Sequence, residues 1–273
     1  MSEATLPARK LFRKSLVIPA EHGAWSWLLV PFGVGVAVAG QVGLPVILTL
    51  VGGLCAFLMR QPAAAWLRMR RGRASRADEP LAAGWTIGLG MAAALCLAGL
   101  LALGRSALLW LLVPALAVLL VYLAATRSGR AGLRTVWMEL SGAVALALMA
   151  PAALIAASGR LDTLAWALWG LMGLHNALGV LYVRLRLADS HHRPVNRVGV
   201  AGMHAAGLAA VAVAAGLGWV PPATALPLVG LLGRAVWAAR QPRPVGDVRR
   251  FGFAELAVEV ISGAWIAASY WIG

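Results

Sequence analysis

Nine apolar runs dominate this sequence, and each is long enough to cross a membrane as a helix. A spanning α-helix needs about 20 mostly apolar residues, because the hydrocarbon core of a bilayer is about 30 Å thick. Short clusters of charged and turn-forming residues separate the runs. The predicted spans cover residues 24–40, 43–59, 80–103, 106–126, 135–158, 163–183, 198–216, 220–239 and 252–272.

The composition excludes an ordinary soluble domain. The chain is 61% hydrophobic and only 12% charged, whereas soluble domains carry about 25% charged residues. We therefore predict an all-α fold, a polytopic membrane helix bundle with nine transmembrane helices. A basic leader over residues 1–17, which lacks the features of a cleaved signal peptide, precedes a single transmembrane domain over residues 18–273.

The basic residues lie on one side of the predicted bundle. With the N-terminus in the cytosol, 22 of the 24 lysines and arginines fall in cytosolic segments or near the cytosolic end of a span, and only Arg105 and Arg160 fall outside. The positive-inside rule explains this asymmetry, and with it the net charge of +14, without nucleic acid as a partner. The sequence predicts a protein of the bacterial inner membrane, contacting membrane lipids, with a cytosolic N-terminus and an external C-terminus.

The first span opens with IPAEHGAWSW, which places Glu21 and His22 at the mouth of an apolar helix. One interpretation is structural, because a carboxylate in the first turn of a helix is favoured by the helix dipole. The other is catalytic, because a titratable pair at the rim of a bundle can act as a general acid or base. The sequence leaves both open.

An arginine lies two residues before a proline at the ends of two predicted spans. The second span ends MRQPAAAWLRMRR, where Pro62 should break or kink the helix beside Arg60, and the eighth ends ARQPRP, which contains Arg240. Guanidinium groups bind phosphate or carboxylate with two parallel hydrogen bonds. Alternatively, the basic residues after Arg60 form a helix that lies on anionic lipid headgroups.

The sixth span carries polar residues into its loop through HNALGVLYVRLRLADSHHRP. Asn176 is costly in hydrocarbon unless it bonds a neighbouring helix or lines a cavity. Arg184, Arg186 and Asp189 follow at the predicted cytosolic end and complete a candidate anion site. Adjacent histidines next to Asp189 could bind a metal, but histidines at a loop tip are more often solvated, so we predict no metal site and no cofactor.

Three carboxylates lie inside predicted spans: Glu139 in the fifth, and Glu255 and Glu259 one turn apart in the ninth. Intramembrane carboxylates are candidates for function. They could equally neutralise arginines such as Arg134 in a structural network, and a network that lines an anion site would do both. We include these acids and Arg134 among the candidate substrate-binding residues.

The opening IPAEHGAWSWLLVPFGVG resembles the YwiC-like family of bacterial membrane proteins, which is marked by a PxEHGAW motif. The wider layout resembles the UbiA superfamily of intramembrane prenyltransferases. That resemblance implies nine helices, a cytosolic N-terminus and functional cytosolic loops after the second and sixth spans. The stretch LVYLAATRSGRAGLRTVWMELSGAVALALMAPAALIAASG is similar to the fourth-to-fifth helix region of that superfamily.

The chain departs from the UbiA pattern in its acidic motifs. UbiA enzymes hold magnesium with Asp-rich motifs after the second span and near the sixth. Here the matching segments read MRQPAAAWLRMRR and LYVRLRLADSHH, and Asp189 is their only carboxylate. Magnesium prefers several oxygen ligands in an octahedron, which these segments do not supply.

The leading hypothesis is a cytosol-facing, arginine-rich cavity that binds an amphipathic anion with an isoprenoid or lipid-like tail. A divergent, metal-independent transferase that uses Glu21 or His22 as a base is one form of it. A second hypothesis is a transporter of small organic anions, which would need polar residues through the outer half of the bundle. A third is a non-catalytic assembly factor for a membrane complex.

Overall fold

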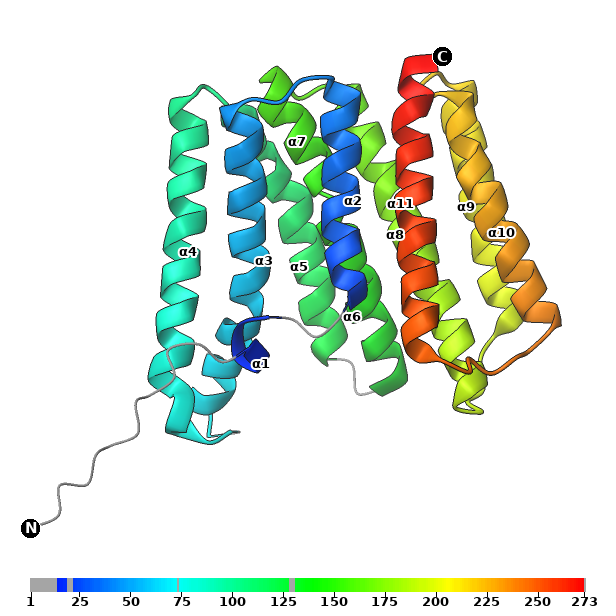
Figure 1. Ribbon diagram of the computed structural model, residues 1–273, viewed down its shortest axis with the longest axis horizontal. Helices are drawn as coiled ribbons and strands as arrows, with labels where there is room; N and C mark the ends of the chain where they lie inside the picture. The colour runs from blue at the N-terminus through cyan, green and yellow to red at the C-terminus, as the bar shows by residue number, and fades with distance from the viewer. Residues whose placement is uncertain (1–13, 19–21, 73, 128–130, 273) are drawn as a thin grey trace, which may run out of the picture. The chain divides into compact units, whose positions relative to one another are not determined.

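A computed structural model describes residues 14–18, 22–72, 74–127 and 131–272, and helices are the regular structure of these segments (Figure 1). The prediction of an all-α membrane protein is confirmed. By their contacts the residues divide into two compact units. The N-terminal unit comprises Met1–Glu21 and Leu48–Gly99, and the C-terminal unit comprises His22–Ile47 and Leu100–Gly273.

Seven helical segments of the described residues are long and apolar enough to cross a membrane. Two shorter apolar helices, Gly23–Ala39 and Ser106–Val118, overlap the first and fourth predicted spans. The chain is therefore a multi-pass membrane protein, and the count of nine spans stays a prediction. The seven segments are Leu44–Arg70, Arg76–Ala102, Val136–Ser158, Thr163–Ser190, Arg197–Gly216, Pro222–Arg240 and Val248–Ile272.

The N-terminal unit is built on two long helices, α3 (Leu44–Arg70) and α4 (Glu79–Ala102), joined through the 3-10 turn η1 (Arg76–Asp78). The short helix α1 (Lys14–Val17) adds Leu16 and Val17 to a cluster of apolar side chains from α3 and α4. Helix α3 continues through Pro62 instead of ending there. Only 17% of the most apolar stretch of α3 and 11% of that of α4 are buried, so both helices expose apolar surface suited to lipid.

The C-terminal unit is a bundle with α8 at its centre. Helix α8 packs against α2, α6, α7, α9 and α10, and 56% of its most apolar stretch is buried. Helices α2 and α11 run side by side, as do α9 and α10 (Figure 1). The elements of the C-terminal unit are α2 (His22–Ala39), η2 (Ser106–Leu111), α5 (Leu112–Arg127), α6 (Ala131–Leu146), α7 (Met149–Ser158), α8 (Thr163–Ser190), α9 (Arg197–Gly216), η3 (Pro222–Thr224), α10 (Ala225–Arg240) and α11 (Val248–Ile272).

The helix boundaries follow from local chemistry. The Asp162 and Asn196 side chains accept hydrogen bonds from the first turns of α8 and α9, at 3.0 and 2.8 Å, as N-cap residues do. The predicted span 135–158 divides into α6 and α7 around Ala147. Pro151 explains the break, because it has no N–H to donate to the carbonyl of Ala147 and its ring would clash with that carbonyl.

Helix α2 packs closely on two neighbours through glycine. A Cβ atom on Gly35 would collide with the backbone carbonyl of Ala150 in α7, and one on Gly263 in α11 would collide with Val30 of α2. Small residues allow such close approach in membrane bundles, where lipid offers apolar surface equal to that of another helix. The glycines therefore determine where α7 and α11 pack on α2.

Several polar contacts join helix ends at one end of the C-terminal unit. The Arg105 Nε donates to the carbonyl of Ala156 at 2.7 Å, and the Trp271 indole donates to the carbonyl of Ala37 at 3.0 Å. Carbonyls in the last turn of a helix lack backbone partners, and Arg105 satisfies one at the end of α7. This contact gives a structural role to one of the two arginines outside the predicted cytosolic segments.

Candidate functional site

One face of α8 is lined with polar side chains. His175, Tyr182, Arg186 and Asp189 are all buried, and their spacing of seven, four and three residues places them on one side of a helix. Gly179 completes the stripe at the position between His175 and Tyr182. A stripe of this kind inside an apolar bundle is expensive unless partners on neighbouring helices meet it.

Helix α11 supplies two carboxylates opposite this stripe. Glu255 binds Arg234 of α10, whose Nη1 donates to both carboxylate oxygens at 2.9 and 2.8 Å. Glu259 Oε1 lies 3.4 Å from His175 Nδ1, without hydrogen-bond alignment, and both side chains are more than 90% buried. The two acids, one turn apart, therefore face two different basic groups.

Aromatic rings lie next to the guanidinium groups at the end of α8 that was predicted to be cytosolic. The Arg234 guanidinium lies 4.1 Å from the centre of the Tyr182 ring. Arg186 and Arg243 lie 5.7 and 5.5 Å from the centre of the Trp237 ring. Cation–π contacts hold the arginines in fixed positions without neutralising them. We call these five residues the arginine–aromatic cluster.

Arg186 differs from the arginines around it. It is 9% exposed, and its Nε and Nη1 atoms have no hydrogen-bond partner among the described residues. Within the same residues, its neighbours on α8 and α9 have carboxylate partners: Arg184 binds Glu139 at 2.7 Å, and Arg197 binds Asp189. In the described part of the chain, no carboxylate is therefore bonded to the buried charge of Arg186.

Asn176 joins three helices. Its Nδ2 donates to the carbonyl of Trp27 in α2 at 3.2 Å and to that of Ala143 in α6 at 3.1 Å. These bonds match the first of the two interpretations of Asn176, which is a bond to a neighbouring helix. Its Oδ1 is buried and has no partner among the described residues.

The other predicted site residues fall in different places. Arg240 is exposed at the end of α10, and Arg60 belongs to the N-terminal unit, where it lies 5.3 Å from the centre of the Phe57 ring. Glu21 lies outside the described residues. His22 begins α2 and Arg134 lies in α6, but their side chains are outside the described part of the chain.

Four members of the cluster were not predicted as site residues: Tyr182, Arg234, Trp237 and Arg243. A signal for Arg234 was present, because it is a charge inside the predicted span 220–239, six residues before the basic end of that span. Intramembrane charge is a functional indicator by itself. Trp237 and Arg243 have no comparable signal, since tryptophan and arginine are both common at span ends.

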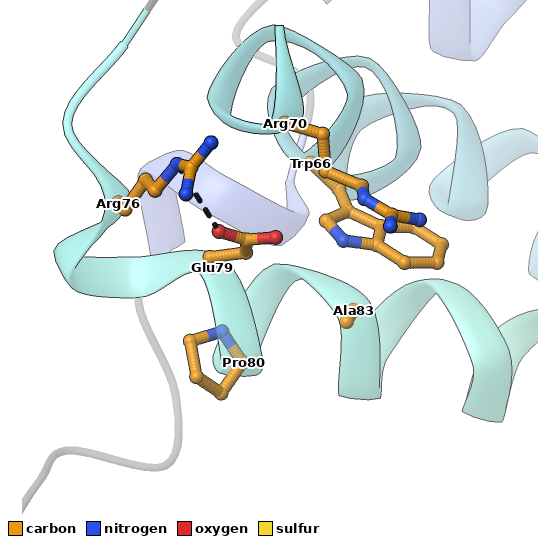
Figure 2. Close-up of a pocket in the computed structure, with 6 residues that line it drawn as sticks. All are labelled: Trp66, Arg70, Arg76, Glu79, Pro80 and Ala83. Carbon is orange, nitrogen blue, oxygen red and sulfur yellow. Dashed lines mark ion pairs between the residues drawn. The ribbon is translucent and has the colours of Figure 1, made fainter. Parts of the chain in front are cut away.

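The N-terminal unit has a pocket of its own. It has a volume of about 460 Å³ and lies where α3 ends and α4 begins (Figure 2). Within it, the Arg70 guanidinium lies 5.6 Å from the centre of the Trp66 ring, and Arg76 lies 3.9 Å from Glu79. Pro80 and Ala83 complete the lining.

Comparison with known families gives one match. The family model described as YwiC-like protein matches residues 18–154, which is half of the chain. The match includes the EHGAW motif and ends in α7, before the arginine–aromatic cluster begins. Comparison with curated proteins and with solved structures finds no match.

Proposed function

Because this chain belongs to the YwiC-like family and is a multi-pass membrane protein, we propose that it binds an amphipathic anion at the arginine–aromatic cluster. The acidic group lies on Arg186, and the isoprenoid or lipid-like tail lies among the apolar helices. The UbiA-like layout belongs to this proposal, as do the roles of Glu21 and His22 as acid or base. The catalytic version of this proposal is a metal-independent transferase that acts on the bound anion.

The guanidinium of Arg186, to which no carboxylate among the described residues is bonded, carries this proposal. A buried charge without a bonded counterion is costly, and breaking a buried ion pair typically costs about 3–5 kcal/mol. A phosphate or carboxylate would supply both the missing charge and the missing hydrogen-bond acceptors of Nε and Nη1. The stacking on Trp237 supports a preorganised site, because the guanidinium is held in place before a ligand arrives.

Isothermal titration of the purified protein tests the proposal, with farnesyl phosphate as the probe and farnesol as its uncharged counterpart. Arg186→Leu removes the buried charge, and Arg193→Ala is the matched control because Arg193 is exposed on the following loop. We expect the wild type and the control to bind farnesyl phosphate but not farnesol. Arg186→Leu should bind at least about tenfold more weakly, a loss of about 1.4 kcal/mol.

Equal affinity of the wild type and Arg186→Leu would overturn the proposal, and so would equal binding of the phosphate and the alcohol. In detergent, Arg186→Leu should melt at or above the wild-type temperature because it removes a buried unpaired charge, and the control should match the wild type because it changes an exposed residue. A stoichiometric protein partner that co-purifies without a bound small molecule would favour the assembly-factor hypothesis instead.

Transport of a small organic anion is a second candidate function, and α11 favours it. Ser262 and Ser269 are buried on α11 beyond Glu259, and the buried Tyr270 hydroxyl has no partner among the described residues. Tyr270 also lines a pocket of about 470 Å³ near the start of α8. Polar groups thus extend along the outer half of α11. Proteoliposomes should release trapped radiolabelled monocarboxylates faster with the wild type than with Arg186→Leu.

The orientation of the chain is part of the same proposal. The predicted cytosolic N-terminus and external C-terminus place the arginine–aromatic cluster on the cytosolic side of the bacterial inner membrane. Reporter fusions test this directly: a fluorescent protein at the N-terminus and alkaline phosphatase at the C-terminus should both be active. Activity only in the opposite arrangement would place the cluster on the external side.

A further inference from the structure

The end of α3 extends beyond the hydrocarbon core. The helix has 27 residues, which corresponds to a length of about 40 Å at about 1.5 Å per residue, against about 30 Å of hydrocarbon. Its last two turns contain Trp66 and Arg70, residue types that mark the headgroup layer. The pocket at this end therefore lies where the phosphates of lipids lie.

The side chains that line this pocket are held in a defined arrangement, in addition to being basic. Arg70 is held against the Trp66 ring, and no carboxylate among the described residues pairs with it. Arg76 faces Glu79 at 3.9 Å, which is too long for a hydrogen bond. Figure 2 shows the Arg76–Glu79 pair on one side of the pocket and the Arg70–Trp66 stack on the other. Both guanidinium groups keep N–H donors for a further acceptor.

The charge of the lining identifies the ligand class. Arg70 and Arg76 contribute two positive charges, and Glu79 contributes one negative charge. A single phosphodiester anion makes the sum zero. A zwitterionic headgroup would add an ammonium group and leave one positive charge in excess.

We propose that this pocket binds the phosphodiester of an anionic glycerophospholipid between Arg70 and Arg76. The ring of Trp66 lies under the Arg70 guanidinium and holds it toward the phosphate. This site goes beyond the proposed function, because it belongs to the N-terminal unit and shares no residue with the arginine–aromatic cluster.

General attraction between a basic helix and acidic lipids is the competing explanation, and the chain contains a matched control for it. Arg68 and Arg71 are exposed arginines on either side of Arg70, and neither lines the pocket. The double variant R68A/R71A removes the same charge as R70A/R76A. The strength of non-specific attraction depends on the total charge, whereas the affinity of a defined site depends on which arginines are removed.

The experiment is native mass spectrometry of the delipidated full-length protein, titrated with phosphatidylglycerol or with phosphatidylcholine. We expect one tightly bound phosphatidylglycerol on the wild type and on R68A/R71A, and at least tenfold weaker binding on R70A/R76A. Trp66→Leu should weaken binding about threefold, because the indole positions Arg70. Circular dichroism and the melting temperature of each variant establish that it is folded.

Equal losses in the two double variants would overturn the proposal in favour of general attraction, and no loss in either would also overturn it. Equal binding of phosphatidylcholine would overturn the charge argument. Glycerol 1-phosphate and inorganic phosphate form the last arm. If either displaces phosphatidylglycerol at micromolar concentration, the pocket takes a soluble phosphate and the lipid assignment is wrong.

Discussion

Each unit holds an arginine–glutamate pair, and the two pairs differ in burial and in geometry. In the N-terminal unit Arg76 and Glu79 have side chains that are 70% and 28% exposed, and 3.9 Å separates them. In the C-terminal unit Arg234 and Glu255 are each 18% exposed and make two short hydrogen bonds. Water and salt weaken the first pair, whereas the second has few other partners. The Arg234–Glu255 pair is therefore part of the packed bundle, whereas Arg76 keeps its charge available to a ligand.

The largest expected effect comes from breaking the buried pair. Glu255→Ala leaves the Arg234 guanidinium buried without its carboxylate, and we expect a loss of about 3 kcal/mol in the free energy of unfolding. Thermal unfolding in detergent, followed by tryptophan fluorescence, measures it. The double variant Arg234→Met/Glu255→Leu should recover most of the loss, because no unpaired charge remains. If the single and double variants melt alike, the unpaired charge is not the cause.

Glycine packing on α2 should give the next largest effect. Gly35→Ala places a Cβ against the backbone of Ala150, which has no flexible atom to move, and overpacking of this kind costs about 1–3 kcal/mol. Gly33→Ala is the matched control, because a Cβ there meets nothing within 4 Å. The control should be neutral or slightly stabilising. Equal losses would mean that helix α2 itself, and not its contact with α7, resists alanine.

The contrast between the units also marks what the sequence can reveal. Apolar runs and the positions of arginines predict a helical membrane protein, because each run carries its own signal within about 20 residues. Such local signals do not predict which carboxylate pairs with which arginine. The sequence offered arginines such as Arg134 as one possible set of partners for the intramembrane acids, and the structure pairs Glu139 with Arg184. Which carboxylate meets which arginine depends on helix packing, and small residues such as Gly35 determine that packing over more than a hundred residues of separation.

The buried polar stripe was only partly predictable for the same reason. Asn176 and the acids of the ninth span were evident as polar residues in apolar runs. The isolation of Arg186 was not, because an arginine near a span end reads as a topology signal until its neighbours are known. A charge is identified as unpaired only after every nearby carboxylate has been assigned to another partner.

A smaller loss is expected from Asn176→Leu. The substitution removes the two hydrogen bonds to the backbones of α2 and α6, and interhelical bonds of this kind contribute about 0.6 kcal/mol each in membrane bundles. We expect a loss of about 1 kcal/mol. Thr86→Val is the control from the N-terminal unit, because the Thr86 hydroxyl bonds only the carbonyl of Ala82 in its own helix. If Thr86→Val loses as much unfolding free energy as Asn176→Leu, the two units do not differ in what a polar side chain contributes to stability.

The smallest effect on stability, and the most informative, is expected from Arg76→Gln. Exposed pairs contribute less than about 1 kcal/mol, and a separation of 3.9 Å places this pair near the lower limit. The melting temperature in phosphatidylcholine should therefore match that of the wild type. In phosphatidylglycerol the wild type should gain stability from the bound lipid, because a ligand that binds only the folded state stabilises it, and Arg76→Gln should gain less. An arginine that matters only when the acidic lipid is present acts through the ligand, whereas equal melting temperatures in both lipids would assign Arg76 to the solvated surface.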